Sequence, residues 1–208
     1  MNLPQSTCIP NCWNKQKKKF MAKIHLTDKP ELLDVIVNNI QTGLSETLGW
    51  LDNVFGIAER LVKFNGNGKR IYTPCFYVKK DEYFELVPDS GLGNFAFFVV
   101  DDPQGVEYDR SSMKMKTPFS LIFWIDYRTI FNDESNRNKE QVKRQILDSL
   151  NGGFWLKSGR IKINRIYNYA ENIYRGFSID EIENQFLMHP FGGFRFEGEL
   201  EISETCII

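Results

Sequence analysis

The chain has 208 residues, 42% of them hydrophobic, and its aromatic side chains comprise 17 Phe, 8 Tyr and 4 Trp. This length suits one domain, with or without short extensions, and the aromatic content excludes intrinsic disorder over most of the chain. The 26 Lys and Arg balance 27 Asp and Glu, which excludes a global attraction to nucleic acid or anionic lipid and leaves only local patches.

Cysteine spacing and hydrophobic run length favour an intracellular protein. The cysteines are too few and too scattered for a disulfide framework, which favours a reducing compartment. The longest apolar runs, such as residues 95–100 and 119–125, are far shorter than the roughly 20 residues of a membrane helix. We therefore expect a protein that stays in the cytosol or joins an assembly formed there. The four cysteines are Cys8, Cys12, Cys75 and Cys206.

Residues 1–22 differ from the rest of the chain. They contain Pro4, Pro10 and a lysine cluster between positions 15 and 19, without hydrophobic periodicity. We expect a flexible N-terminal extension, followed by a single domain over residues 23–208.

Residues 28–48 predict an amphipathic helix. Asp28 and Glu31 have the spacing of a capping box, and Pro30 suits a first helical turn. Apolar residues then recur at steps of three and four, which predicts a helix lying on a sheet. This stripe consists of Leu33, Ile36, Val37, Ile40, Leu44 and Leu48.

Aromatic-rich strands are expected next. Residues 65–68 are a turn signal, and the strand predicted over 71–78 contains Pro74, which favours an edge position or a bulge. Residues 82–87 complete a hairpin with that strand, and residues 95–100 have the apolar character of a buried strand.

Two polar stretches predict loops. Residues 103–117 lack a hydrophobic period and predict a long exposed loop, and residues 132–137 predict a second one. Between them, residues 119–130 are bulky and apolar, so they predict a strand.

A second helix is expected over residues 138–150. Asn138 and Gln141 form its capping pair, and Gly152 with Gly153 would end it. A further strand is expected from Arg160 onward.

The C-terminal part predicts a short helix and a final strand. Ser178 and Glu181 repeat the capping-box spacing before a short third helix over 179–187. Gly192 and Gly193 predict a turn. Apolar and charged residues then alternate over 194–202, as in a half-buried antiparallel strand with its charged face in water.

These elements together predict an α+β fold: a single domain whose mostly antiparallel (mixed) sheet is flanked by two main helices and a short third helix. The sequence carries no assembled catalytic or metal-binding constellation. Catalysis by a Ser-His or Cys-His pair needs a histidine, and only His25 and His189 are available, both in lead-in or turn positions. Cys8 and Cys12 supply half of a zinc site, with every other Cys and His distant in sequence. We therefore expect no metal, no cofactor and no enzymatic activity.

A metal-dependent nuclease is the alternative enzyme. Asp89, Asp101, Asp102 and Asp126 follow or flank predicted strands and could hold magnesium. Residues 95–100, however, contain neither a second carboxylate nor a lysine to polarise water, so these carboxylates are more simply solvated strand ends.

Nucleic-acid binding by the central sheet is not favoured. Such a surface would alternate Lys or Arg with exposed aromatic residues. Phe97, Phe98, Phe123 and Trp124 instead lie in runs without charged neighbours, which indicates a core.

Three segments resemble the tail terminator, or tail completion, proteins of tailed bacteriophages and prophages. They are Phe119–Trp124, Asn172–Ser178 and Met188–Phe196. Together with the order of elements, the resemblance spans about residues 24–203. The stretch before it and the insert at 103–117 depart from the family pattern.

The resemblance implies a structural protein that forms an oligomeric ring, commonly a hexamer. Such a ring caps the tail tube and joins it to the head connector, first in the host cytoplasm and then in the virion tail. Its partners would be other copies of the chain and these tail and connector proteins, with no membrane, no small-molecule substrate, and nucleic acid only passing through the ring. The alternative is an α+β binding or scaffold domain.

The predicted loops and the start of the last strand are the expected subunit or partner contacts, because partners add at loops and sheet edges. The residues that we expect there are Asp109, Arg110, Met113, Met115, Asn132, Asp133, Phe191 and Phe194.

Overall fold

The computed structural model describes residues 21–79, 82–89, 91–102, 104–109, 112–131, 138–151, 159–179 and 182–205. Its helices are α1 (Leu33–Thr47), α2 (Tyr127–Phe131), α3 (Lys139–Asn151), α4 (Ala170–Ile173) and the 3-10 helix η1 (Asn184–Leu187). Its strands are β1 (Lys23–His25), β2 (Asn53–Ile57), β3 (Glu59–Phe64), β4 (Arg70–Lys79), β5 (Glu82–Glu85), β6 (Phe95–Val100), β7 (Gly105–Asp109), β8 (Ser112–Asp126), β9 (Gly159–Tyr167) and β10 (Phe191–Thr205). None of the described helices combines the length and apolar character that crossing a membrane would require.

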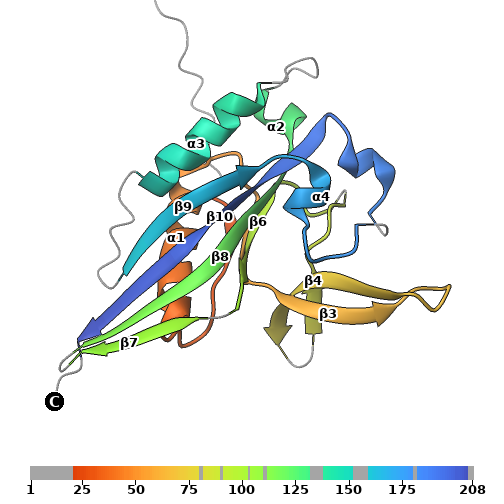
Figure 1. The fold of residues 1–208 in the computed structure, drawn as a ribbon. Coiled ribbons are helices and arrows are strands. Elements are labelled where there is room, and N and C mark those ends of the chain that lie inside the picture. Colours follow the sequence, from red (N-terminus) through yellow and green to blue (C-terminus); the bar gives the residue numbers. More distant parts are fainter. Residues whose placement is uncertain are drawn as a thin grey trace, which may run out of the picture.

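A mixed seven-stranded sheet forms the centre of the molecule, in the order β1-β2-β6-β8-β10-β9, with β7 paired to the first part of β8 (Figure 1). β1, β2 and β6 run parallel to one another. The pairs β6–β8, β7–β8, β8–β10 and β9–β10 are antiparallel. The predicted α+β class, with a mostly antiparallel mixed sheet and two main helices, is confirmed.

The helices α1 and α3 pack on one face of this sheet. Their apolar stripes meet every second residue of β8, including Leu121, Phe123 and Ile125, in one buried cluster. The predicted cap of α3 is confirmed: the backbone N–H of Gln141 donates to Asn138 Oδ1 at 3.1 Å.

The predicted capping box of α1 is wrong. The helix begins at Leu33, and the residue before it has no side-chain capping bond. Lys29 and Leu32 have φ values of 52° and 46°, in the left-handed region, which interrupts a helical path from Asp28.

A second aromatic cluster covers part of the opposite face. It includes Phe55, Phe97 and Trp124 from the sheet, with Tyr174 and Phe186 from the chain between β9 and β10. The short helix predicted over 179–187 is reduced to η1, and α4 was not predicted. The Oγ of Ser178 accepts the backbone N–H of Tyr72 at 3.0 Å, and Glu181 of the predicted capping box lies outside the described residues.

The loop predicted over 103–117 is wrong, because β7 and the first part of β8 form an antiparallel pair there. Val106 and Tyr108 alternate with polar residues, and so do Met113 and Met115, which is the period of two expected for strands. The turn predicted at Gly192 and Gly193 is also wrong, since both lie in β10. A Cβ on Gly193 would collide with the carbonyl oxygen of Phe123 on β8, so a close strand approach explains this glycine.

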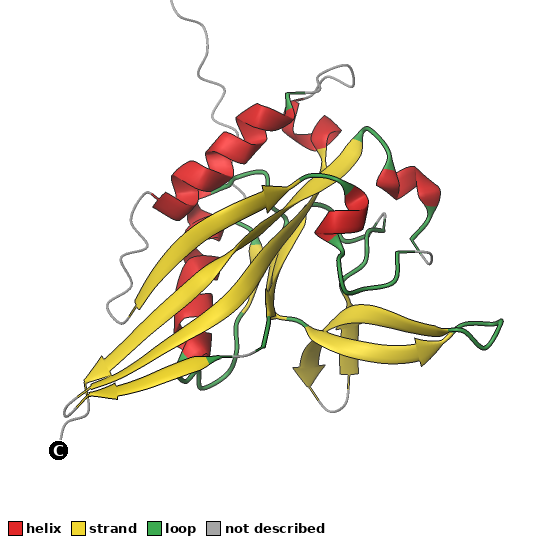
Figure 2. Cartoon of the chain, viewed as in Figure 1, coloured by secondary structure: helices red, strands yellow, loops and turns green. Residues whose placement is uncertain are grey.

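A separate antiparallel sheet has the order β3-β4-β5 and projects from the body (Figure 2). The predicted hairpin of β4 and β5 is confirmed, and β3 was not predicted. Pro74 lies on the central strand, so the predicted edge position is wrong. Its carbonyl accepts the Leu86 N–H on the β5 side, just beyond the last pair, Cys75 with Glu85. In an antiparallel pair the N–H that Pro74 lacks would donate to the carbonyl oxygen of Leu86, which instead accepts the Tyr174 hydroxyl at 3.3 Å.

Candidate interaction surfaces

The two long strands β8 and β10 extend the main sheet beyond the helices that cover it. β8 and β10 have 15 residues each and pair from Asp126 and Phe191 at one end to Ser112 and Thr205 at the other. At about 3.3 Å per residue, this ribbon is roughly 45–50 Å long. Figure 1 shows β7, β8 and β10 tapering to a tip at its far end. We call the part formed by residues 105–109, 112–116 and 200–205 the β-arm.

The β-arm brings the apolar face of the sheet into solvent. Met115, 7% exposed, ends the buried cluster and pairs with Val106 on β7 and Ile202 on β10. The side chains of Val106 and Tyr108 are 47% and 78% exposed. The apolar stripe thus continues from the core onto an edge strand that pairs only with β8 among the described strands, as is typical of a contact surface.

The small sheet is the second surface with exposed apolar side chains. The rings of Phe76 and Phe84 lie 5.8 and 5.6 Å from that of Phe55, so these contacts hold the sheet against the body. Phe64, near the β3–β4 turn, is 72% exposed. The exposed large hydrophobic residues of this sheet are Val62, Phe64, Tyr77, Val78, Tyr83 and Phe84.

A buried arginine links the sheet to the chain after α4. Arg195 on β10 is 3% exposed, so the expectation that its strand turns only a charged face to water is wrong at this position. Its Nη1 donates to the carbonyl oxygen of Arg175 at 3.0 Å, and its Nε donates to Glu197 Oε1 at 2.9 Å. Burial lowers the pKa of Arg195, whereas the carboxylates of Glu197 and Asp101 act in the opposite direction. These contacts fix the covering segment on the sheet.

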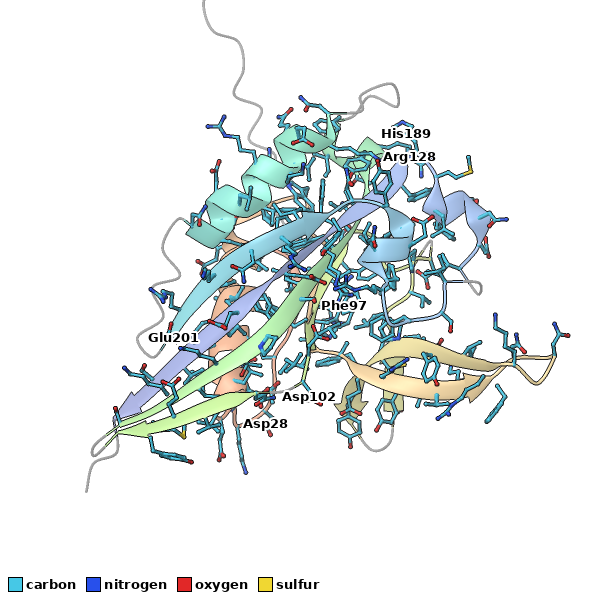
Figure 3. All side chains as sticks on the ribbon, viewed as in Figure 1. Asp28, Phe97, Asp102, Arg128, His189 and Glu201 are labelled. Atoms are coloured by element: carbon cyan, nitrogen blue, oxygen red, sulfur yellow. The ribbon has the colours of Figure 1, made fainter. Side chains whose placement is uncertain are left out.

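The expected contact residues divide between the two ends of the β8–β10 ribbon. Met113 is half-buried and Met115 buried on the β-arm, and Asp109 is the last residue of β7. At the other end, the Phe191 ring contacts Phe186 at 5.1 Å, and Phe194 is fully buried in this chain's own core. Figure 3 shows Arg128 and His189 near this second end, and Glu201 on the β-arm. The remaining expected residues, Arg110, Asn132 and Asp133, lie outside the described residues.

Two carboxylates of the nuclease alternative, Asp89 and Asp126, make structural contacts. Asp89 Oδ1 accepts the N–H groups of Gly91 and Leu92, both at 2.7 Å. Asp126 pairs with Arg128 at 2.8 Å. Within the described part of the chain, no three His, Cys, Asp or Glu side chains are grouped so that they could hold a metal ion.

His25 lies between aromatic rings. Its imidazole stacks on Phe55 with centroids 4.3 Å apart, and Nε2 lies 3.3 Å from Asn53 Oδ1. Burial lowers the pKa of His25, and the hydrogen bond to Asn53 opposes this effect.

The chain matches no protein-family model, and no curated protein sequence matches it significantly. The functional argument therefore depends on the surfaces themselves. The sequence prediction missed the small-sheet surface because β3 was not identified. The alternation of Arg60, Val62 and Phe64 before the turn at residues 65–68 is the signal that could have identified it.

Proposed function

We propose that the protein is a structural subunit of a bacteriophage or prophage tail. It acts as a tail terminator that forms an oligomeric ring, caps the tail tube and joins it to the head connector. The protein assembles in the host cytoplasm and becomes part of the virion tail. The observation that carries the proposal is the pair of projecting β structures, the β-arm and the small sheet, each with exposed apolar side chains.

A ring requires two different surfaces on each subunit. Head-to-tail contacts close into a ring only when one surface of a copy fits another surface of the next copy. The β-arm, with Val106 and Tyr108, and the small sheet, with the paired and half-exposed Tyr77 and Tyr83, differ in sequence and in place (Figure 1). Unpaired strand edges with exposed apolar side chains are the sheet features that other chains add to. These features support an assembly role.

The experiment measures assembly state with a matched pair of variants. The full chain is analysed by multi-angle light scattering and electron microscopy, alone and with tail tubes of the phage that encodes it. Tyr108→Glu places a charge on the β-arm, and Tyr169→Glu places one on a tyrosine that is similarly exposed, at 71% against 78%. We expect wild type and Tyr169→Glu to form rings on tubes, and Tyr108→Glu not to.

A wild-type chain that remains monomeric and leaves tail tubes uncapped would contradict the proposal. Monomeric binding to a partner protein would instead favour the alternative of an α+β binding or scaffold domain. If Tyr108→Glu and Tyr169→Glu form rings equally well, the β-arm is not the contact surface, although the protein still forms a ring.

A further inference from the structure

One face of the small sheet combines cationic and aromatic side chains. Arg60, Val62 and Phe64 alternate along β3, so they share a face. Val62 pairs directly with Tyr72 on β4, and Phe64 pairs with Arg70. Directly paired residues lie on the same side of a sheet, so all five form one surface, which we call the Arg60–Tyr72 face.

Two guanidinium groups lie close to a single phenol ring on this face. The Cζ of Arg60 is 3.8 Å from the ring centroid of Tyr72, and that of Arg70 is 5.3 Å from it. Neither arginine forms an ion pair with a carboxylate of the described residues. By contrast, five other arginines do so: Arg128, Arg144, Arg160, Arg175 and Arg195.

Two acidic residues of the small sheet lie on its other side, and the third, Glu82, lies at the far end of the sheet, where it pairs with Lys79. Glu59 pairs with Cys75, which pairs in turn with Glu85, so these three share the opposite face. Lys63 belongs to that face too and forms its ion pair with Glu85 there. The two guanidinium groups therefore repel each other, no carboxylate of the described residues pairs with either of them, and an anion bound between them would be stabilised.

The same face offers an exposed ring for stacking, beside a strand that is held to the body. Phe64 is 72% exposed and lies directly opposite Arg70. Tyr72 is held to the body at its backbone, since its N–H donates to Ser178 Oγ at 3.0 Å and its carbonyl accepts the Ser178 N–H at 2.8 Å. Exposed rings interleaved with arginines on a sheet are the combination that binds unpaired bases and their phosphates.

We infer that the Arg60–Tyr72 face binds single-stranded nucleic acid. Arg60 and Arg70 contact successive phosphates, and a base stacks on Phe64. This inference is independent of ring formation. An acidic protein segment would satisfy the two arginines and leave the Phe64 ring unused, which is why the combined charge and stacking surface favours a nucleic acid strand.

The test measures binding of a fluorescein-labelled oligothymidine to the full chain by anisotropy, over a range of salt concentrations. Arg60→Gln/Arg70→Gln removes both proposed phosphate contacts. Lys162→Gln/Arg165→Gln removes two exposed cations from β9 and is the matched control. Each lost phosphate contact to a single strand makes the negative slope of log affinity against log salt shallower by about 0.7. The slope of the first variant should therefore be shallower by about 1.4, and that of the control should not change. Phe64→Ala should weaken binding about tenfold. Unchanged thermal unfolding of all variants shows that they remain folded.

Several results would overturn the inference. These are no oligothymidine binding at low salt, equal salt slopes for the two double variants, or unchanged affinity in Phe64→Ala. If a duplex of matched length binds as tightly as the single strand, no unpaired base stacks on Phe64. Equally tight binding of polyglutamate would assign the face to an acidic protein partner. Self-association that Arg60→Gln/Arg70→Gln abolishes, without oligothymidine binding, would assign it to a second copy of the chain.

Discussion

Arg195 donates a hydrogen bond to Glu197 at 2.9 Å, two residues along the same strand, while only 3% of its side chain is exposed. The other side of the guanidinium donates to the carbonyl oxygen of Arg175. This one side chain therefore joins β10 to the segment that covers the second aromatic cluster. A buried cation with so many contacts is costly to disrupt, because its partners lose their hydrogen bonds without regaining water.

Replacing Arg195 should destabilise the fold strongly. Arg195→Ala leaves Glu197 and the carbonyl of Arg175 without this donor, and we expect a loss of about 3–5 kcal/mol in the free energy of unfolding. Arg160→Ala is the control, because Arg160 forms an exposed ion pair with Glu201 that is worth less than about 1 kcal/mol. Urea unfolding of both variants measures the difference. Equal losses would show that the Arg195 contacts do not hold the covering segment.

Removing a core aromatic ring should lower the free energy of unfolding far more than removing an exposed one. Phe97 is fully buried, with its ring 6.1 Å from Phe95 and 6.2 Å from Tyr174, and Figure 3 labels it in the middle of the body. We expect Phe97→Ala to cost about 3–5 kcal/mol, because it leaves a cavity. Tyr108→Ala, at a site that is 78% exposed, should change the free energy of unfolding of the monomer by less than about 0.5 kcal/mol. A small loss for Phe97→Ala would mean that the second cluster packs loosely.

The sequence predicted those elements whose signals are local. The cap of α3 depends on Asn138 and Gln141, three residues apart, and it is present. The buried strand at 95–100 is a continuous apolar run, and it lies between two other strands of the sheet. In both cases the information needed lies within a few consecutive residues.

Other features depended on contacts between distant segments. The alternation of charged and apolar residues in β10 correctly predicted a strand, but nothing in that strand shows that the chain at Ile173 and Arg175 covers Arg195. Leu32 adopts a left-handed conformation that an apolar stripe does not predict, and this shortens α1. The expected contact residues were grouped because residues 109–115 were predicted to lie in a loop and residues 191–194 at the start of the last strand. Strand pairing in fact places them at opposite ends of a 15-residue ribbon.

The thiol of Cys75 should be unreactive in the folded protein. Burial, with a further contribution from Glu85, raises its pKa to about 11. At pH 8 the thiolate fraction is then about one in a thousand, compared with about a quarter for an ordinary cysteine of pKa about 8.5. In a variant with Cys8, Cys12 and Cys206 changed to serine, iodoacetamide should therefore react at least about a hundredfold more slowly in native buffer than in urea. Equal rates in the two conditions would show that the small sheet opens readily around Cys75.

His25 should make stability fall as the solution becomes mildly acidic. Burial lowers its pKa in the folded chain below the value of about 6.5 expected when unfolded, so the unfolded chain takes up the proton first. The stabilisation that neutral His25 contributes to the free energy of unfolding is complete above about pH 6.5, and it is lost as the pH falls through the folded-state pKa. His25→Phe retains an aromatic ring beside Phe55 and cannot be protonated. Urea unfolding from about pH 7.5 to about pH 5 should therefore show a smaller loss of free energy for His25→Phe than for wild type, whereas parallel losses would place the responsible proton on another group.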